Sequence, residues 1–403
     1  MKLDRTIAEA AEIYDSFYLY SEAGILAQSE KLKTAFPGVS FLYSVKCNPN
    51  RHILRSVFDN GFGADAASAG EVLLAGQAGL GKENIYYSAP GKTQADIEET
   101  IDKAFLIADS LDEIKRIELA AEKKQLAVKI GIRVNPAFSF GGGPGLPSKF
   151  GIDEAQAFAC LREYHHLNVR ITGLHVHLRS QELNASALEQ YYRNILAMAD
   201  RLQRDCGVQL EYINMGSGLG IPYAKADAPL PIEELGRKTE QEICKFRERY
   251  PGVRFLIETG RYIVGKNGIY VTKVLDRKTS QGKTYLIVRN TLNGFLRPSL
   301  ARLITRCAKE HPVACEPLFT QTDAFTVSAL KKEPASEIVT IVGNLCTAAD
   351  VIAEDVEMPH LECGDLLTIS NAGAYGAVLS PMQFSSQDRP AELFLKQNGE
   401  LLV

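Results

Sequence analysis

Short apolar runs alternate with amphipathic segments between residues 41 and 258. The runs of strand length are residues 41–47, 62–67, 85–88, 105–109, 128–134, 171–178, 210–215 and 253–258. Helix-like segments lie between them, and in residues 188–204 apolar side chains recur every three or four positions, as on one buried helix face. Strands separated by helices imply right-handed βαβ units and a parallel sheet. Eight such strands predict an α/β TIM barrel rather than an open sheet.

The pattern changes near residue 260, where strand-like runs and turns replace the alternation. Apolar runs at residues 270–275, 284–288, 338–342, 366–369 and 391–395 predict a second, β-rich domain. The strand-like residues 17–20 precede the first barrel segment, and we expect them to pair with that domain. The predicted organisation is therefore a barrel over residues 27–260, with residues 1–26 and 261–403 forming the β-rich domain.

Composition excludes several functional classes. The net charge of −4, without a basic cluster, argues against nucleic acid as a partner. No apolar run is long enough to span a membrane, and the N-terminus lacks the apolar core of a signal peptide. The eight cysteines include no Cys-x-x-Cys pair, so neither a metal site nor a disulfide framework is indicated. We expect a cytoplasmic enzyme without a metal.

Polar residues follow the ends of the predicted strands, where TIM barrels carry their active sites. A desolvated Lys46 at the end of the first strand would have a lowered pKa and act as a nucleophile for a carbonyl; the alternative is a lysine that extends into solvent. The loop Gly216–Gly220 presents backbone N–H groups suited to a phosphate. Arg261 would add a bidentate partner, unless it pairs with Glu258. A reactive lysine and a phosphate loop together suggest pyridoxal phosphate.

An ordered series of motifs resembles one enzyme family. The series comprises Tyr43-Ser44-Val45-Lys46-Cys47-Asn48, His175-Val176-His177 with Ser180-Gln181, Gly216-Ser217-Gly218-Leu219-Gly220, Glu258-Thr259-Gly260-Arg261, Cys346-Thr347-Ala348-Ala349-Asp350 and Asn371-Ala372-Gly373-Ala374-Tyr375-Gly376. It is similar to the series in the fold-type III pyridoxal-phosphate decarboxylases, which include diaminopimelate, ornithine and arginine decarboxylases. The resemblance extends over nearly the whole chain and implies an alanine racemase-like barrel followed by a β-rich domain.

The resemblance also implies roles for individual residues. Lys46 matches the lysine that holds pyridoxal 5′-phosphate as a Schiff base, and Glu258 matches the carboxylate that faces the pyridine nitrogen. Cys346 matches a cysteine that reaches in from the second subunit of a homodimer and protonates the product carbon, so the β-rich domain would contribute to the dimer interface and the active site. The other implied cofactor residues are Asp65, Arg133, His177, Ser180, Gly216, Ser217, Gly218, Gly260, Arg261 and Tyr375, with Ser68 and Glu71 in neighbouring motifs.

His175 and His177 alternate along one predicted strand, so only one of them can face the barrel interior. We therefore expect His175 to be a packing residue.

Glu258 distinguishes between reactions within this fold. A carboxylate beside the ring nitrogen favours the protonated pyridinium, which delocalises the electrons left when CO₂ departs. The related alanine racemases carry an arginine at this place. We therefore predict a decarboxylase, with an amino-acid racemase as the alternative. A third possibility is a non-catalytic pyridoxal-phosphate-binding protein. The second domain and Cys346 argue against it.

Four residues bear on the substrate. Arg297 resembles the arginine with which diaminopimelate decarboxylases bind a distal carboxylate; the alternative is a surface arginine. The residue after the matching cysteine is acidic in the ornithine and diaminopimelate enzymes and binds a distal amine, whereas this chain has Thr347. Asp350 either compensates or only orients the loop, and Arg179 stands where many relatives have glycine.

These departures favour an amino acid or conjugate with a distal carboxylate. The Cys-Thr-x-x-Asp form looks more like that of specialised decarboxylases, which act on citryl-linked diamino acids of siderophore pathways or on glutamyl groups held by a carrier protein in antibiotic pathways. The alternative is diaminopimelate decarboxylase of lysine biosynthesis.

Overall fold

The computed structural model describes residues 2–164, 168–307 and 323–403. The chain divides into two compact units. Leu26–Ile221 and Pro229–Gly260 form one, here called the barrel unit. Met1–Ile25, Pro222–Ala228 and Arg261–Val403 form the other, here called the sheet unit.

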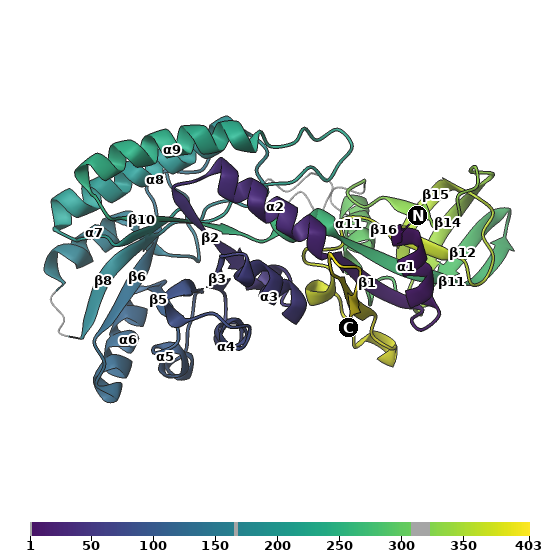
Figure 1. Cartoon of the computed structure of the whole chain (residues 1–403), viewed down its shortest axis with the longest axis horizontal. Helices are drawn as coiled ribbons and strands as arrows, with labels where there is room; N and C mark the ends of the chain where they lie inside the picture. The colour runs from purple at the N-terminus through teal and green to yellow at the C-terminus, as the bar shows by residue number, and fades with distance from the viewer. Residues whose placement is uncertain (1, 165–167, 308–322) are drawn as a thin grey trace. The chain divides into compact units, whose positions relative to one another are not determined.

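Parallel strands close into a barrel in the barrel unit (Figure 1). Their order is β5-β4-β3-β2-β10-β9-β8-β6, and β5 also pairs with β6, which closes the ring. The strands are β2 (Val39–Ser44), β3 (Gly63–Ala66), β4 (Ile85–Ser88), β5 (Phe105–Ala108), β6 (Val128–Asn135), β8 (Val169–His175), β9 (Tyr212–Asn214) and β10 (Arg254–Thr259). The predicted eight-stranded TIM barrel is confirmed. A short strand, β7 (Ile152–Asp153), pairs with β6 outside the ring.

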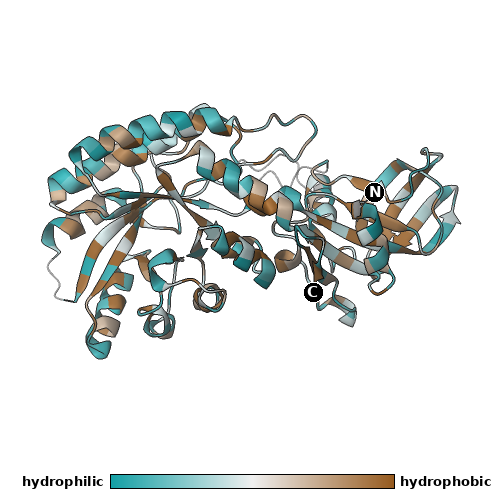
Figure 2. Ribbon diagram, in the orientation of Figure 1, coloured by the Kyte–Doolittle hydropathy of each residue, from teal (hydrophilic) through white to brown (hydrophobic). Residues whose placement is uncertain are grey.

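Helices connect the barrel strands. They are α2 (Glu22–Ala35), α3 (Arg51–Asp59), α4 (Ala69–Gln77), α5 (Gln94–Thr100), α6 (Leu111–Lys124), α7 (Glu154–Glu163), α8 (Ala185–Cys206) and α9 (Ile232–Arg249). The predicted apolar stripe of α8, from Leu188 to Leu202, is buried. Asn184 caps the N-terminus of α8 by accepting from two backbone N–H groups, and Gly207 ends it in the left-handed conformation. Figure 2 shows hydrophobic residues along the barrel strands and both kinds of residue on α8 and α9, as expected for helices that cover a barrel.

Two strands end three residues earlier than predicted, and both ends matter for the site. The first barrel strand ends at Ser44 rather than at residue 47, because Val45–Cys47 form a single 3₁₀ turn, η1. The sixth barrel strand, β8, ends at His175 rather than at residue 178.

The sheet unit is built on a nine-stranded mixed sheet. Its main path is β15-β14-β12-β11-β1-β17-β18, and β16 pairs with β11 and β13. The strands are β1 (Ser16–Ser21), β11 (Gly268–Ser280), β12 (Lys283–Val288), β13 (Val327–Ala329), β14 (Glu337–Gly343), β15 (Val351–Met358), β16 (Leu366–Ile369), β17 (Ala391–Leu395) and β18 (Leu401–Leu402). The expectation that residues 17–20 join this domain is confirmed, because β1 pairs antiparallel with β11 and parallel with β17.

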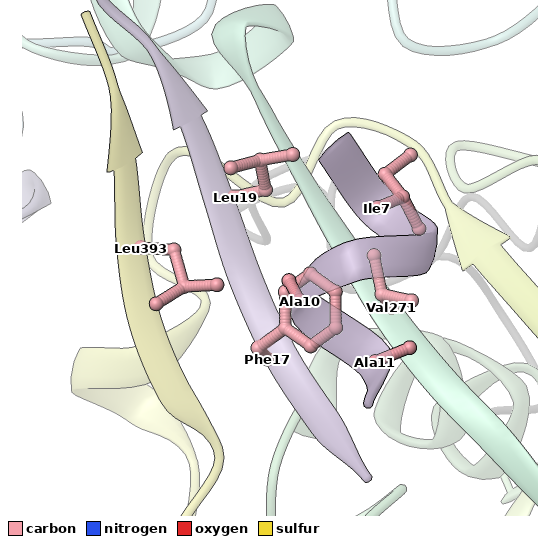
Figure 3. Close-up of a cluster of buried hydrophobic side chains, with 7 residues drawn as sticks. All are labelled: Ile7, Ala10, Ala11, Phe17, Leu19, Val271 and Leu393. Carbon is pink, nitrogen blue, oxygen red and sulfur yellow. The ribbon is translucent and has the colours of Figure 1, made fainter. Parts of the chain in front are cut away.

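Helix α1 (Lys2–Ala11) covers part of this sheet (Figure 3). Its buried residues Ile7, Ala10 and Ala11 pack on Phe17, Leu19, Val271 and Leu393 from β1, β11 and β17. Two further helices carry residues discussed below: α10 (Arg261–Val264) and α11 (Leu296–Cys307). Among the described residues, no helix has the length and apolar composition of a membrane span.

Candidate active site

The amine of Lys46 lies beside a buried acid. Lys46 occupies η1, and its Nζ donates a 2.9 Å hydrogen bond to Oδ2 of Asp65 on β3. Ser44, the last residue of β2, donates to the same oxygen at 2.9 Å. The Lys46 side chain is 45% exposed and that of Asp65 is 1% exposed. The prediction of a desolvated lysine is therefore wrong: β2 ends before Lys46, and the turn places the side chain in a half-exposed position.

Burial and the charge of Glu258 raise the pKa of Asp65, against the lowering effect of Lys46.

Farther along, Ser68 and Glu71 organise the start of α4. The hydroxyl of Ser68 accepts from the backbone N–H of Glu71 at 3.1 Å, and the carboxylate of Glu71 accepts from the N–H of Ala67 at 2.6 Å. Both residues thus hold the segment that follows β3.

Glu258 on β10 is 3% exposed and belongs to a buried network. Its Oε1 accepts a 2.8 Å hydrogen bond from Nδ2 of Asn214, the last residue of β9. Oδ1 of Asn214 accepts in turn from the N–H of Gly216 at 3.0 Å, and the N–H of Glu258 donates to the carbonyl of Gly216 at 2.9 Å. The carboxylate and the glycine loop are therefore connected through Asn214.

His175 contacts the same carboxylate. Its Nε2 lies 3.0 Å from Oε1 of Glu258, and its ring is 1% exposed. Burial acts to raise the pKa of Glu258, but His175 and Lys46 outweigh burial and lower that pKa, so the carboxylate is ionised at neutral pH. The expectation that His175 only packs is wrong. It rested on strand alternation through His177, whereas β8 ends at His175 and the backbone beyond it is no longer a regular strand.

The glycine loop fixes the ring of His177. The backbone N–H of Ser217 donates to Nδ1 of His177 at 3.0 Å, and the hydroxyl of Ser180 lies 3.5 Å from Nε2. Gly216 has φ 68°, and a Cβ there would lie 2.3 Å from the carbonyl oxygen of Val176, so the loop requires glycine. Burial, assisted by nearby cations, lowers the pKa of His177 to about 3, which keeps the imidazole neutral.

Arg133 on β6 is held from three sides. Its Nη2 donates to the carbonyl of His177 at 3.3 Å, and its Nη1 lies 3.9 Å from Oδ1 of Asp109. The guanidinium carbon lies 4.4 Å from the ring centroid of Phe150. Arg133 therefore supports the backbone that carries His177.

Arg179 is directed elsewhere. Its side chain is 56% exposed, pairs with Glu182 at 3.3 Å and lies over the ring of Phe140, 5.4 Å from the centroid. The contact with Phe140 connects Arg179 to the glycine-rich segment 137–145, and Glu182 connects it to the glycine loop, because the N–H of Glu182 donates to the carbonyl of Gly218 at 2.8 Å.

Gly260 ends the barrel unit and allows a close approach. A Cβ at Gly260 would lie 2.7 Å from Cβ of Cys47 and 3.3 Å from that of Ser44. Any side chain there would displace η1, which carries Lys46.

In the sheet unit, two buried arginines contact Tyr375. Arg261 donates to the hydroxyl of Tyr223 at 3.3 Å, and its guanidinium carbon lies 4.8 Å from the ring centroid of Tyr375. Arg297 donates from Nε to the carbonyl of Tyr375 at 3.4 Å. Tyr375 has φ 54°, a left-handed conformation that is rare for an aromatic residue. Arg297 is 2% exposed, so the alternative of a surface arginine is wrong.

The segment with Cys346 is organised by Asp350. Asp350 is 2% exposed and accepts from the hydroxyl of Thr291 and from the N–H groups of Leu292 at 2.9 Å and Leu345 at 3.0 Å. This arrangement favours the reading in which Asp350 orients the loop. Cys346 itself is an exposed free thiol, and the hydroxyl of its neighbour Thr347 accepts from the N–H of Ala349 at 3.3 Å.

Residues 22–265 match the family model described as pyridoxal-dependent decarboxylase, pyridoxal binding domain. The chain is also 33% identical to L-glutamyl-[BtrI acyl-carrier protein] decarboxylase of Niallia circulans, over 95% of this chain and 89% of the relative. The chain belongs to the pyridoxal-dependent decarboxylases. Membership of this family makes the protein a carboxy-lyase that uses pyridoxal phosphate.

Other members of the family are similar over the same length. Diaminopimelate decarboxylase of Aquifex aeolicus is 29% identical, over 99% of this chain and 91% of the relative. The crystal structure of diaminopimelate decarboxylase from Helicobacter pylori, complexed with L-lysine, superposes with a TM-score of 0.83 at 27% identity, covering 98% of this chain and 95% of that one.

The barrel unit of this decarboxylase has residues that fit its cofactor. It presents a half-exposed amine at Lys46, a buried carboxylate at Glu258 that stays ionised, and a neutral imidazole at His177 fixed by the glycine loop. When bound, pyridoxal phosphate supplies an electron-accepting pyridine ring.

Sequence reasoning gave no role to three contributors to this network: Ser44, Asn214 and Asp109. Their position was the available signal, because Ser44 and Asn214 are the last residues of β2 and β9 and Asp109 directly follows β5. The carboxyl ends of barrel strands are where TIM-barrel enzymes place functional side chains.

Proposed function

We propose that this decarboxylase removes the α-carboxylate of a glutamyl group attached to a carrier protein. An α-decarboxylation requires a free α-carboxylate, so such a glutamyl group is attached through its side-chain carboxyl. Its distal end is then an uncharged acyl group rather than an amine or a carboxylate.

Thr347 is the observation that carries this proposal. The relatives that act on diamino substrates have an acid after the matching cysteine, whereas Thr347 offers only a hydroxyl. Asp350 does not replace that acid, because its carboxylate already accepts three hydrogen bonds, from Thr291, Leu292 and Leu345. The carrier-protein decarboxylase of Niallia circulans, at 33% identity, supports the same reading.

Arg297 is the proposed partner of the distal acyl oxygen. A guanidinium donates to a carbonyl oxygen as well as to a carboxylate, so a buried Arg297 suits either distal group. Diaminopimelate is therefore the second candidate substrate, and the relatives that decarboxylate it support that alternative. A citryl-linked diamino acid is the third.

The residues proposed for the chemistry follow from the family match and the geometry. Lys46, directed by Asp65, holds the cofactor, and Glu258 faces its ring nitrogen. His177 lies against the ring, with Arg133 supporting its backbone. The residues proposed for the phosphate are Ser180, Gly216, Ser217, Gly218, Gly260, Arg261 and Tyr375.

Cys346 is proposed to deliver the proton to the product carbon in the site of a second copy of the chain. A test is to mix the variants Lys46→Ala and Cys346→Ala, each inactive alone. If the sites are shared in a two-fold dimer, mixing restores up to about one quarter of the wild-type activity, because one site of each mixed dimer has both residues intact. No recovery in mixed dimers isolated by two affinity tags would contradict the shared site.

The substrate is tested by measuring CO₂ release from a panel. The panel contains a glutamyl carrier protein, a glutamyl thioester of pantetheine, free L-glutamate, meso-diaminopimelate, L-ornithine, L-lysine and citryl-diaminopropionate. We expect the highest kcat/KM with the two glutamyl thioesters. A higher kcat/KM with diaminopimelate would replace the proposal by its alternative, and Lys46→Ala, which should release no CO₂, is the control.

A further inference from the structure

His175 occupies a buried position between two polar groups from different strands. Its Nε2 lies 3.0 Å from Oε1 of Glu258 on β10, and its Nδ1 lies 3.4 Å from the hydroxyl of Ser88 at the end of β4. In the ring of strands β8 is separated from β10 by β9, and from β4 by β6 and β5. The imidazole therefore connects distant parts of the barrel wall through the interior.

The roles assigned above do not account for this histidine. A buried histidine is often only a packed core residue with satisfied nitrogens. Here, however, one nitrogen faces a carboxylate that is itself 3% exposed. The other described partner of that carboxylate is the neutral amide of Asn214, and an ionised group in such a place needs more than one neutral donor to offset its lost hydration.

The two neighbours of His175 indicate which nitrogen carries the proton: the ionised carboxylate of Glu258 can only accept, so the proton belongs on Nε2, and Ser88 is then the donor to Nδ1. A serine hydroxyl can donate to Nδ1, and a neutral imidazole has one donor and one acceptor nitrogen. If Ser88 donates to Nδ1, the proton of His175 is on Nε2, directed at Glu258.

We infer that His175 is a positioning residue that holds Glu258 ionised and in one orientation, with Ser88 selecting the Nε2–H tautomer. The inference rests on the role proposed for Glu258 beside the ring nitrogen of the cofactor. It assigns no bond-making step to His175, which acts through the carboxylate.

The electrostatics of the site agree with this role. His175 is the foremost of the groups that lower the pKa of Glu258 against the opposing effect of burial. Lys46 acts in the same direction. Asp65 on β3 interacts unfavourably with Glu258, since each carboxylate opposes the ionisation of the other.

Four variants separate this role from a structural one. His175→Leu removes the donor, His175→Gln keeps an N–H donor, Ser88→Ala removes the tautomer selector, and Glu258→Gln removes the charge. His360→Gln is the matched control, because His360 also lies beside glutamates but is 52% exposed in the sheet unit.

The readouts are the ¹⁵N ring shifts of His175 in the full-length protein, the pH dependence of the holoenzyme absorbance spectrum, and kcat. We expect the proton of His175 on Nε2 in the wild type and a different distribution between the two ring nitrogens in Ser88→Ala. Losing the 3.0 Å polar contact to the charged Glu258 should lower kcat about 10- to 100-fold in His175→Leu, with most of the loss rescued in His175→Gln. His175→Leu should also shift the pH dependence of the spectrum.

A double-mutant cycle gives the decisive comparison. If His175 acts through Glu258, His175→Leu has little further effect on kcat or on the spectrum when Glu258→Gln is already present. The inference would be overturned if His175→Leu lowered kcat equally in the wild type and in Glu258→Gln, or if the wild type carried the Nδ1–H tautomer. A Glu258→Gln enzyme with the wild-type spectrum and kcat would instead refute the role of Glu258. If His175→Leu does not fold, the tautomer measurement and the Ser88→Ala spectrum still decide.

Discussion

Lys46 donates a 2.9 Å hydrogen bond to Asp65, whose side chain is 1% exposed. The proposed cofactor lysine is thus directed by an acid on the neighbouring strand rather than by burial of its own ammonium. Ser44 donates to the same oxygen of Asp65, so both partners of the acid come from the end of β2 and the turn that follows it.

Asp65→Asn should lower activity and raise stability. The amide loses a charge-assisted hydrogen bond to Lys46, which should reduce kcat/KM about 10- to 100-fold. The raised pKa of Asp65 means that the folded chain disfavours its ionised form. Ionisation of Asp65 therefore lowers the free energy of unfolding, and this loss increases as pH rises above the ordinary pKa of 3.8. The variant should therefore have a higher Tm than the wild type near neutral pH, measured without cofactor. Asp59→Asn, at a 74% exposed position of α3, is the control and should change neither quantity.

Glu258→Gln should destabilise the folded chain in a pH-dependent manner. The pKa of Glu258 is lower in the folded chain than its ordinary value of 4.5, so the ionised carboxylate contributes stability that is fully present above that value. This contribution is lost as pH falls below 4.5 towards the folded pKa. Urea unfolding should show a difference between wild type and variant near pH 7 that shrinks in acid. A difference that grew as pH fell would contradict the sign.

Breaking the buried ion pair of Lys92 and Glu113 should strongly destabilise the folded chain. Both side chains are 0% exposed, and Nζ of Lys92 also donates to the carbonyls of Ala89 and Ile107 at 2.8 Å each. Burial lowers the pKa of Lys92 and raises that of Glu113, so each charge depends on the other. Lys92→Met should reduce the free energy of unfolding by about 3–5 kcal/mol, measured by urea denaturation.

Two comparisons make that prediction specific. The double variant Lys92→Met with Glu113→Leu should recover much of the loss, because it leaves no unpaired buried charge. Lys115→Met breaks an ion pair with Asp112 on the exposed face of α6 and should have no measurable effect. Similar losses in Lys92→Met and Lys115→Met would show that burial is not the cause.

Thr347→Glu should change the substrate preference. If the neutral hydroxyl excludes a distal amine, an acid at this position would supply the missing charge, worth about 10- to 100-fold in kcat/KM for diaminopimelate relative to the wild type. CO₂ release measured with diaminopimelate and a glutamyl thioester gives the ratio directly. Thr347→Gln introduces a side chain of nearly the same size as glutamate but without its charge, and it should not raise activity on diaminopimelate.

The order of elements could be predicted from the sequence because it depends on local patterns. Alternation of apolar runs with amphipathic segments indicated eight strands, and their closure into a barrel is confirmed. The buried stripe of α8 was equally predictable, since helix periodicity is a property of neighbouring residues. In the sheet unit, strands β13, β15 and β18 and helix α11 were not predicted; β13 and β18, with 3 and 2 residues, are too short to show an apolar alternation.

The motifs likewise led to the family, and strand ends indicated which residues to examine. They did not show how those residues are partnered. Whether Lys46 is buried, whether His175 packs or contacts Glu258, and whether Arg297 lies at the surface all depend on where β2 and β8 end and on side chains that approach from other strands. Hydrogen bonds and charge interactions act over a few ångströms between residues far apart in the chain, so burial and pKa shifts arise only once the barrel has closed.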